Sequence, residues 1–436
     1  MKMGMSLTAT VAMCCSLIAG AAAAERSLTT ELEVLLKTNP KLLAAAKSIE
    51  AAQQGIREAE SGFYPKVTVS GDIGPEWVDS PTRRSAGQEA FRSTARSTSL
   101  TVTQNLFEGF RTTGQTRIAE LRKDVSSLNF DITQQTVLLD GIRAYISVLK
   151  QSRLLEIAKT NEQTLQTQLN LESARVERGS GLAVDVLQAK SRLQLARERV
   201  VRIMGELRQA QSSYVEVFGH PAVPAQMILP PVPTALLPET VEAAEAAAAA
   251  ENAVLRRSIA QIDIADEQRT VAESTYWPKI DLVGESNWED DVDGTAGIRR
   301  EGRIVLRASW DIFDGFLTPA RSGRASAEYG AALDTRMTTD REVRDRVRRA
   351  WDQYRTTAEQ AELLQNAVNI ASEVFEARQK LRQSGRESVI NLLDAENELN
   401  NARLRYNEAV FDNTLASYRV LLQTGRLTPA NLQLRR

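Results

Sequence analysis

The sequence is poor in the residues from which most active sites are built. Its two cysteines, Cys14 and Cys15, both lie in an apolar N-terminal segment, and His220 is the only histidine among 436 residues. It contains neither a Gly-rich phosphate loop nor a zinc-binding His-Glu-x-x-His motif. An enzyme is therefore the least favoured class, and neither a cofactor, a disulfide nor a cysteine-bound metal is expected.

Other common features are also scarce. The net charge is −2 and basic residues form no cluster, so nucleic-acid binding has no support. After the N-terminal segment, no run approaches 18 apolar residues, and no transmembrane helix is expected. His220 lies between Gly219 and Pro221, where a solvated or capping role is favoured over metal ligation. The acidic run over 290–293 lacks the EF-hand spacing and is interpreted as a solvated turn.

The N-terminus has the pattern of a secretory signal peptide. Lys2 is followed by an apolar stretch over 7–18 and by Ala22-Ala23-Ala24, a small-residue cleavage site that places the signal at 1–24. A membrane anchor is the alternative, but the apolar stretch is short for one. Neither cysteine follows a small residue, so lipidation is not expected.

The remaining chain contains an internal duplication. Six pairs of identical residues are separated by a constant offset of 206, so no net insertion or deletion separates the two copies. Two equivalent halves are therefore expected. The pairs are Phe107 and Phe313, Gly109 and Gly315, Gly179 and Gly385, Leu187 and Leu393, Ala189 and Ala395, and Gly219 and Gly425.

Each copy begins with stretches in which apolar and polar residues alternate, which predicts strands with one face of each kind. The first β-hairpin is expected over 66–73 and 93–107, joined by a polar stretch over 74–92. The second is expected over 279–285 and 303–312. No apolar helix adjoins these strands to cover their apolar faces. A membrane barrel, apolar outside and polar inside, would satisfy the same pattern.

Four strands per chain cannot close a barrel, and open sheet edges are not tolerated in lipid, so the barrel is expected to be shared between protomers. Two protomers would supply eight strands, whose interior fills with side chains, and three would supply twelve around a lumen. Aromatic residues gather where strands meet helices, as in interfacial girdles, although packing at these corners is an alternative explanation. They are Phe63, Tyr64, Phe107, Phe110, Tyr276, Trp277, Phe313 and Phe316.

The rest of the chain has helical periodicity. Apolar residues from Ile118 to Leu149 follow heptad spacing, with Gln135 as the one gap, which indicates a coiled-coil seam. Residues 28–61 are also expected to be helical, with a kink or restart at Pro40.

The helix lengths indicate a tall helical hairpin in each of the two halves of the chain. The outward helix over 110–178 would be about 104 Å long, and its broken return over 182–218 and 239–275 would be slightly longer, about 111 Å. The predicted division is 1–24 signal peptide, 25–62 tunnel helix, 63–109 first β-hairpin, 110–218 first helical hairpin, 219–238 equatorial linker, 239–275 tunnel helix, 276–315 second β-hairpin, 316–424 second helical hairpin and 425–436 equatorial tail.

Short motifs recur at the junctions and tips of both halves. Each first strand opens with aromatic-Pro-Lys, each long helix with Phe-Glu/Asp-Gly-Phe, and each tip carries a Gly-led turn. As a set they resemble the TolC family of outer-membrane secretion and efflux ducts, over nearly the whole mature chain. The family usually has a second Gly where Phe110 and Phe316 stand, a departure interpreted as harmless. The carriers are Tyr64-Pro65-Lys66, Trp277-Pro278-Lys279, Phe107-Glu-Gly-Phe110, Phe313-Asp-Gly-Phe316, Gly179-Ser-Gly-Leu-Ala-Val-Asp185 and Gly385-Arg-Glu-Ser-Val-Ile-Asn391.

The resemblance implies a mainly α protein with a membrane β part. Three protomers would share a 12-stranded outer-membrane barrel, continued by a tunnel of long helices in the periplasm. Such ducts dock through a periplasmic adaptor protein onto an inner-membrane ABC or RND transporter, and carry secreted proteins, toxins or drugs. Because the sequence lacks a cysteine for lipidation, it is more similar to the secretion-type branch of the family, which serves type I secretion.

The resemblance also implies roles at the helix tips. A cation-selective acidic constriction falls on Asn391 and Asp394, so only one of the two positions is acidic here. The tip turns Gly179, Gly181 and Gly385 are the expected adaptor contacts. The alternative for Asp394 is that it complements the dipole of a nearby helix N-terminus.

Closure of the tunnel entrance is expected from links between neighbouring tips. The resemblance assigns one partner to Asp185, for which a helix-dipole role is the alternative. The position expected to hold its Arg partner is Glu387, with Arg386 adjacent and Arg382 one turn before as alternatives. The competing function is a periplasmic coiled-coil spacer or adhesive protein, which the charged inner strand faces disfavour.

Overall fold

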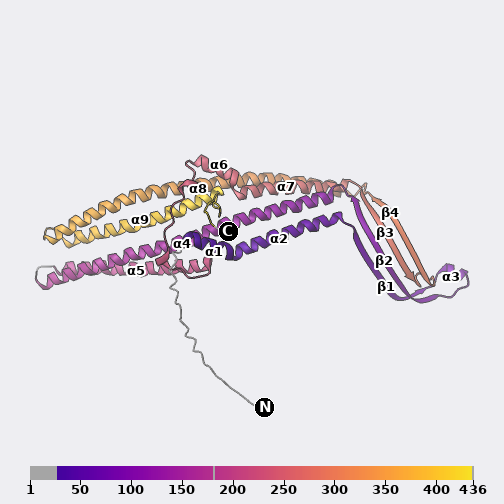
Figure 1. Cartoon of the computed structure of the whole chain (residues 1–436), viewed down its shortest axis with the longest axis horizontal. Helices are drawn as coiled ribbons and strands as arrows, with labels where there is room; N and C mark the ends of the chain where they lie inside the picture. The colour runs from indigo at the N-terminus through magenta and orange to yellow at the C-terminus, as the bar shows by residue number, and fades with distance from the viewer. Residues whose placement is uncertain (1–26, 180–181, 435–436) are drawn as a thin grey trace, which may run out of the picture.

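The computed structural model describes residues 27–179 and 182–434. The predicted signal segment with both cysteines, and Gly181, lie outside these ranges. Long helices run side by side along most of the molecule, and a sheet extends from one end of them (Figure 1). The elements are α1 Leu28–Thr38, α2 Pro40–Glu60, β1 Lys66–Val78, α3 Pro81–Ser85, β2 Phe91–Phe107, α4 Arg111–Glu177, α5 Ala183–Phe218, α6 Val241–Glu251, α7 Ala253–Glu273, β3 Lys279–Asp290, β4 Ile298–Ser309, α8 Leu317–Gln383 and α9 Val389–Thr424, with short 3-10 turns between some of them.

Two helical hairpins make up the body of the molecule. The helices α4 and α8 have 67 residues each, which is about 100 Å, and α5 and α9 return along part of that length with 36 residues each. Toward the sheet, α2 lies along α4 and α7 along α8 (Figure 1). The prediction of tall hairpins with broken return helices is confirmed.

The return helices break at two equivalent asparagines. Asn39 separates α1 from α2, and its Oδ1 accepts a hydrogen bond from the amide of Lys41. Asn252 separates α6 from α7 in the same way, although one continuous helix was expected over 239–275. The two asparagines are 213 residues apart, the offset that also separates Pro65 from Pro278. At Asn39 the next helix begins with Pro40, whereas at Asn252 the asparagine cap marks the break without a proline.

The largest hydrophobic cluster lies at mid-length, where α1 crosses α4 near the C-terminus (Figure 1). At Gly141 of α4, a Cβ would lie 2.6 Å from Leu35 Cδ2, so any larger residue would force the buried leucine side chain to shift. The gap in the heptad seam also has a role here. Gln135 is buried, and its side-chain amide donates to the carbonyl of Gly425 at 3.3 Å, which joins α4 to the end of α9.

The sheet has the order β1-β2-β3-β4, with every neighbouring pair antiparallel. Val69 pairs with Leu100 and Leu282 with Leu306, so the apolar residues share one face. That face is exposed in the protomer, and Ile304 is 80% exposed. Asp281, Glu285, Arg303 and Arg307 share the other face, as predicted for strands that separate lipid from water. Near the hairpin turns the separation ends, because Arg96, Asp290 and Arg300 lie on the apolar face.

The strand ends differ from the prediction. The first hairpin is longer, because β1 continues through 74–78 and β2 begins at Phe91, with α3 between them. The second hairpin also extends further toward its turn, because β3 continues to Asp290 and β4 begins at Ile298. At its other end β4 stops earlier than expected, at Ser309 rather than at Ile312. Ser309 pairs with Lys279, and the next partner would be Pro278, which has no amide hydrogen to donate.

Candidate functional site at the tips of the helical hairpins

Each helical hairpin reverses direction at a glycine. Gly179 follows α4 with φ 75°, and Gly385 follows α8 with φ 77°. Because glycine has no Cβ, it enters this left-handed region at little cost, which explains the residue at both tips. After the second turn, the amide of Arg386 donates to the carbonyl of Leu381 at 2.9 Å and closes it.

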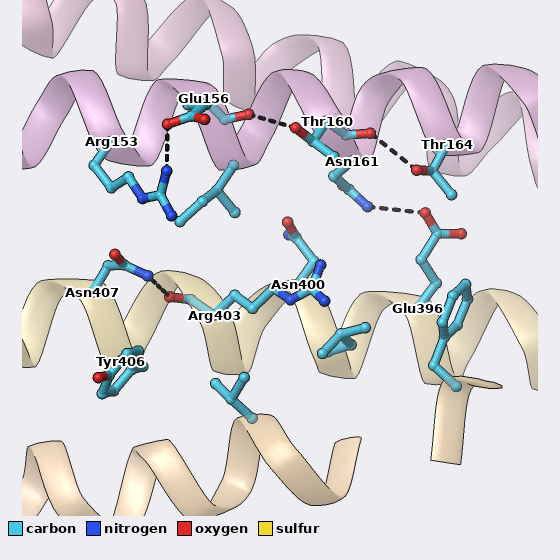
Figure 2. Close-up of a pocket in the computed structure, with 14 residues that line it drawn as sticks. Arg153, Glu156, Thr160, Asn161, Thr164, Glu396, Asn400, Arg403, Tyr406 and Asn407 are labelled. Carbon is cyan, nitrogen blue, oxygen red and sulfur yellow. Dashed lines mark hydrogen bonds and ion pairs between the residues drawn. The ribbon is translucent and has the colours of Figure 1, made fainter. Parts of the chain in front are cut away.

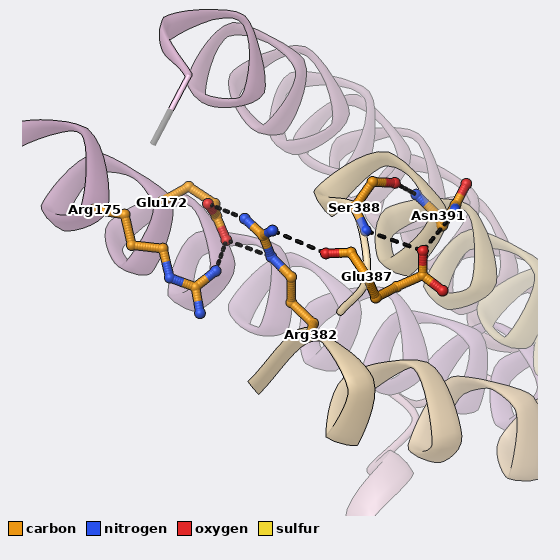
Figure 3. A network of polar contacts seen from close by, with 6 residues as sticks. All are labelled: Glu172, Arg175, Arg382, Glu387, Ser388 and Asn391. Carbon is orange, nitrogen blue, oxygen red and sulfur yellow. Dashed lines mark hydrogen bonds and ion pairs between the residues drawn. The ribbon is translucent and has the colours of Figure 1, made fainter. Parts of the chain in front are cut away.

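An ion-pair network joins the two hairpins beside these turns (Figure 3). Glu172 of α4 has a side chain only 2% exposed, and its Oε2 lies 2.6 Å from Nη2 of Arg382 in α8. Arg175 contacts the other carboxylate oxygen at 2.7 Å. Arg382 also donates to the carbonyl of Glu387 at 3.0 Å. Arg175 belongs to the same helix as Glu172, so it is the buried pair of Glu172 with Arg382 that ties α4 to α8.

The residues predicted to close the tip differ in whether they form an ion pair within the protomer. Arg382 pairs with Glu172 of its own protomer. Asp185 is half-buried in the first turn of α5, and Arg386 is exposed on the tip turn. Among the described residues, neither of these two forms an ion pair within the protomer. A link between them across neighbouring protomers therefore stays a prediction.

Glu387, which stands at the expected arginine position, is an acceptor within its own turn. Its carboxylate accepts from the side-chain amide of Asn391 at 2.6 Å and from the backbone of Ser388 at 3.0 Å (Figure 3). These hydrogen bonds, the one from Asn391 foremost, hold the pKa of Glu387 below its ordinary value. The Asn391 amide is thus held by its neighbour one turn before it.

Asp394 has a partner that the sequence did not indicate. Its Oδ1 lies 2.7 Å from Nη2 of Arg192, which projects from α5. Both side chains are partly exposed, at 55% for Asp394 and 40% for Arg192. The position predicted to be an acidic constriction therefore carries a positive charge beside the negative one.

A cavity of about 350 Å³ lies further along the same helices, between α4, α8 and α9 (Figure 2). Glu396 of α9 is 4% exposed, and its Oε1 accepts from the side chain of Asn161 at 3.2 Å. Within the described part of the chain, its Oε2 and the nearby Asn400 Nδ2 have no hydrogen-bond partner. Burial raises the pKa of Glu396 from 4.5 to about 7. Sequence periodicity alone could not distinguish this acid from the exposed ones.

The aromatic residues at the strand–helix junctions are mostly exposed, as expected for a girdle. The Phe107 and Phe110 rings meet edge to face at 5.8 Å, and the Phe313 and Phe316 rings at 5.4 Å. Phe110 and Phe316 have φ 67° and 68°, so the positions where the family usually has glycine are left-handed. The substitution therefore carries backbone strain and is not harmless. The other members are Phe63, Tyr64, Tyr276 and Trp277, all about half exposed or more.

Comparisons with known proteins agree with this architecture. Residues 32–220 and 246–422 match the family described as outer membrane efflux protein. The chain belongs to this family. It is 23% identical over 430 residues to the outer membrane efflux protein BepC of Brucella suis, covering 98% of this chain and 91% of that protein. It is 22% identical to the outer membrane protein TolC of Escherichia coli, with 91% and 81% covered.

Further likenesses support the same fold. The alkaline protease secretion protein AprF of Pseudomonas aeruginosa is 23% identical, with 92% of this chain and 84% of that protein covered. The solved outer membrane channel CmeC of Campylobacter jejuni superposes with a TM-score of 0.79 at 14% identity, with 92% and 85% covered. VceC of Vibrio cholerae superposes with a TM-score of 0.78, also at 14% identity, with 91% and 96% covered.

Membership of the efflux family assigns the protein its place in the cell. It is an outer-membrane channel with its tunnel in the periplasm, and not an enzyme. Such channels are homotrimers that work with periplasmic adaptor proteins and inner-membrane ABC or RND transporters. The exposed apolar face and the two open sheet edges of a single protomer are therefore covered in the assembly by lipid and by neighbouring strands.

Other candidate sites of this efflux channel have structural roles. His220 is not simply solvated, because its Nε2 lies 3.0 Å from the buried carboxylate of Glu31. Asp291 accepts from the amide of Gly297 at 2.8 Å within the β3–β4 turn. The described ranges contain no cluster of three potential metal ligands from His, Cys, Asp and Glu. Within the same ranges, no helix combines the length and the apolar character needed to cross a membrane.

Proposed function

We propose that this channel is the exit duct of a secretion-type tripartite export machine, and that it carries secreted proteins, toxins or drugs from the cell. The sheet carries this proposal. Its apolar face is exposed, its outer strands β1 and β4 have open edges, and it stands at one end of hairpins about 100 Å long. Similarity to AprF, which is named for alkaline protease secretion, supports the secretion branch, and the equal identity to BepC, which is named an efflux protein, keeps drugs among the proposed cargo.

We further propose how the chain divides along this duct. Residues 63–109 and 276–315 would form the barrel wall, with their aromatic residues at the membrane interface. The segments 219–238 and 425–436 would form a belt around the middle of the tunnel. The cluster at mid-length supports the belt, because Met227 and Leu427 are both buried in it.

We propose that the tips control the periplasmic entrance. Asp394, with Asn391 one turn before it, would line the constriction, because a threefold assembly turns each residue into a ring of three. Asp185 and Arg386 would link neighbouring tips, and Gly179 and Gly385 would face the adaptor. The Glu172–Arg382 network supports this assignment, since it holds the tips of both hairpins of one protomer together.

Electron microscopy of the protein purified from outer membranes in mild detergent tests the proposed assembly. A threefold, tapered cylinder with a rod of about 100 Å is expected. A soluble particle without threefold symmetry would contradict it and favour the periplasmic spacer. Secretion of a reporter protein by a strain with and without the gene then distinguishes protein export from drug efflux.

A further inference from the structure

Arg192 places a positive charge where the proposed constriction needs a negative one. Its guanidinium lies 2.7 Å from the Asp394 carboxylate, across the contact between α5 and α9. The other position of the constriction, Asn391, is neutral, and its amide is bound by Glu387. Of the two constriction positions, only Asp394 therefore carries a carboxylate of its own, and that carboxylate faces a cation.

A second arginine lies further from the tip on the same helix. Arg199 is seven residues after Arg192 on α5, about 10 Å along the helix and on nearly the same face. Both arginines line one small groove with Leu393, which directly precedes Asp394, and with Asn397, which lies one helical turn after it. Of these two arginines, only Arg192 pairs with Asp394, so it is the cation that acts at the height of the constriction.

The net charge of the lining determines which ions a pore favours. Fixed charges act on a passing ion within about a Debye length, roughly 10 Å at 0.1 M salt, whether or not they also pair with each other. A ring of unopposed carboxylates favours cations. In the trimer, three Arg192 guanidiniums stand beside three Asp394 carboxylates, so their fields offset one another.

We propose that Arg192 is a selectivity-determining residue of this duct, because it opposes the charge of Asp394 and makes the constriction nearly neutral. Anionic solutes would then enter as readily as cationic ones. This inference rests on the proposed constriction at Asp394, and the experiment separates the two.

Reversal potentials in planar bilayers test the proposal, with purified trimer in a tenfold KCl gradient. The ratio of potassium to chloride permeability of the natural protein is expected within about twofold of one. Arg192→Gln should raise this ratio about threefold or more, and Asp394→Asn should lower it by a similar factor. The double variant should return toward the natural value. Arg192→Lys keeps the charge and should change the ratio little.

Lys190→Gln is the matched control, because it removes an exposed cation from the same helix on a different face. It should leave the ratio unchanged, and an equal response to it would overturn the proposal. If Asp394→Asn changes the ratio and Arg192→Gln does not, the constriction stands and the role of Arg192 is disproved. If neither substitution changes the ratio, the constriction is elsewhere and the proposal fails with it. A natural protein that forms no channel would refute the proposed function itself.

Discussion

The guanidinium of Arg382 lies 2.6 Å from the carboxylate of Glu172, a residue 210 positions earlier in the chain. The pair joins α4 to α8 beside the tip turns, where the two hairpins would have to separate if the entrance widens. The carboxylate is almost completely buried, so this is not an exposed surface ion pair. We call the Glu172–Arg382 pair the lock between the hairpins.

Breaking this lock should loosen the tip. In the Arg382→Gln variant, Glu172 keeps a buried charge with only Arg175 beside it, and we expect a local loss of about 3 kcal/mol. Hydrogen exchange of the amides at the end of α4 should accelerate, and single-channel conductance should rise. Arg202→Gln, which removes an exposed pair with Glu198 and Glu206, is the control and should change neither. Unchanged exchange in Arg382→Gln would show that the lock does not hold the tip.

The stability of the trimer should depend on pH through Glu396. Its pKa is raised by burial from 4.5 to about 7, so between these values the folded state binds more protons than the unfolded state. The contribution of Glu396 is therefore fully present below pH 4.5 and is lost as the pH rises through 7, a change of about 3 kcal/mol per protomer.

Thermal unfolding of the detergent-solubilised trimer from pH 5 to pH 8 measures this effect. Glu396→Gln should remove most of the decline with pH and should be the more stable protein at pH 8. Glu398→Gln, an exposed acid on the same helix, should keep the natural slope. Arg153, Glu156 and Arg403 are the charged residues that line the same cavity as Glu396. An unaltered slope in Glu396→Gln would rule out the buried acid as its source.

Glycine should be favoured over alanine at Phe316. Both substitutions remove the ring, but at φ 68° only alanine retains the left-handed strain, so the glycine variant should be about 1 kcal/mol more stable. Phe313 is the control, because it is not among the described residues with positive φ and the order should reverse there. Thermal unfolding of the four variants gives both comparisons. The same order at both positions would argue against strain at Phe316.

Alanine should be poorly tolerated at Gly141. The new methyl group would lie 2.6 Å from Leu35 Cδ2 and 2.9 Å from Leu32 Cδ2, and both leucines are buried in the mid-length cluster. We expect a loss of about 1–3 kcal/mol. At Gly205, where a methyl group would meet no atom within 4 Å, alanine should be neutral or stabilising. Denaturation of both variants measures the difference, and equal stabilities would mean that α1 can move away from α4.

Much of the architecture could be read from the chain. The constant offset between the halves, the alternation in the strands and the tip glycines at 179 and 385 predict two β-hairpins and two tall helical hairpins. These features are local, because backbone conformation and periodicity depend on residues close together in sequence. The break at Asn252 was missed for the same reason, since asparagine is tolerated within a helix and only its repeat partner Asn39 marks it as a cap.

Which charged residues pair with one another could not be predicted from the sequence and is known only from the tertiary structure. With 54 basic and 56 acidic side chains in the sequence, any acid has many possible partners, and spacing along one helix does not select among partners on another. Packing of α9 against both α4 and α8 brings Arg382 to Glu172 and buries Glu396, while the contact of α5 with α9 brings Arg192 to Asp394. Burial and ion pairing depend on which surfaces meet in space. The architecture of the duct could therefore be predicted from the sequence, whereas the pairing of its charged residues is determined by the tertiary packing.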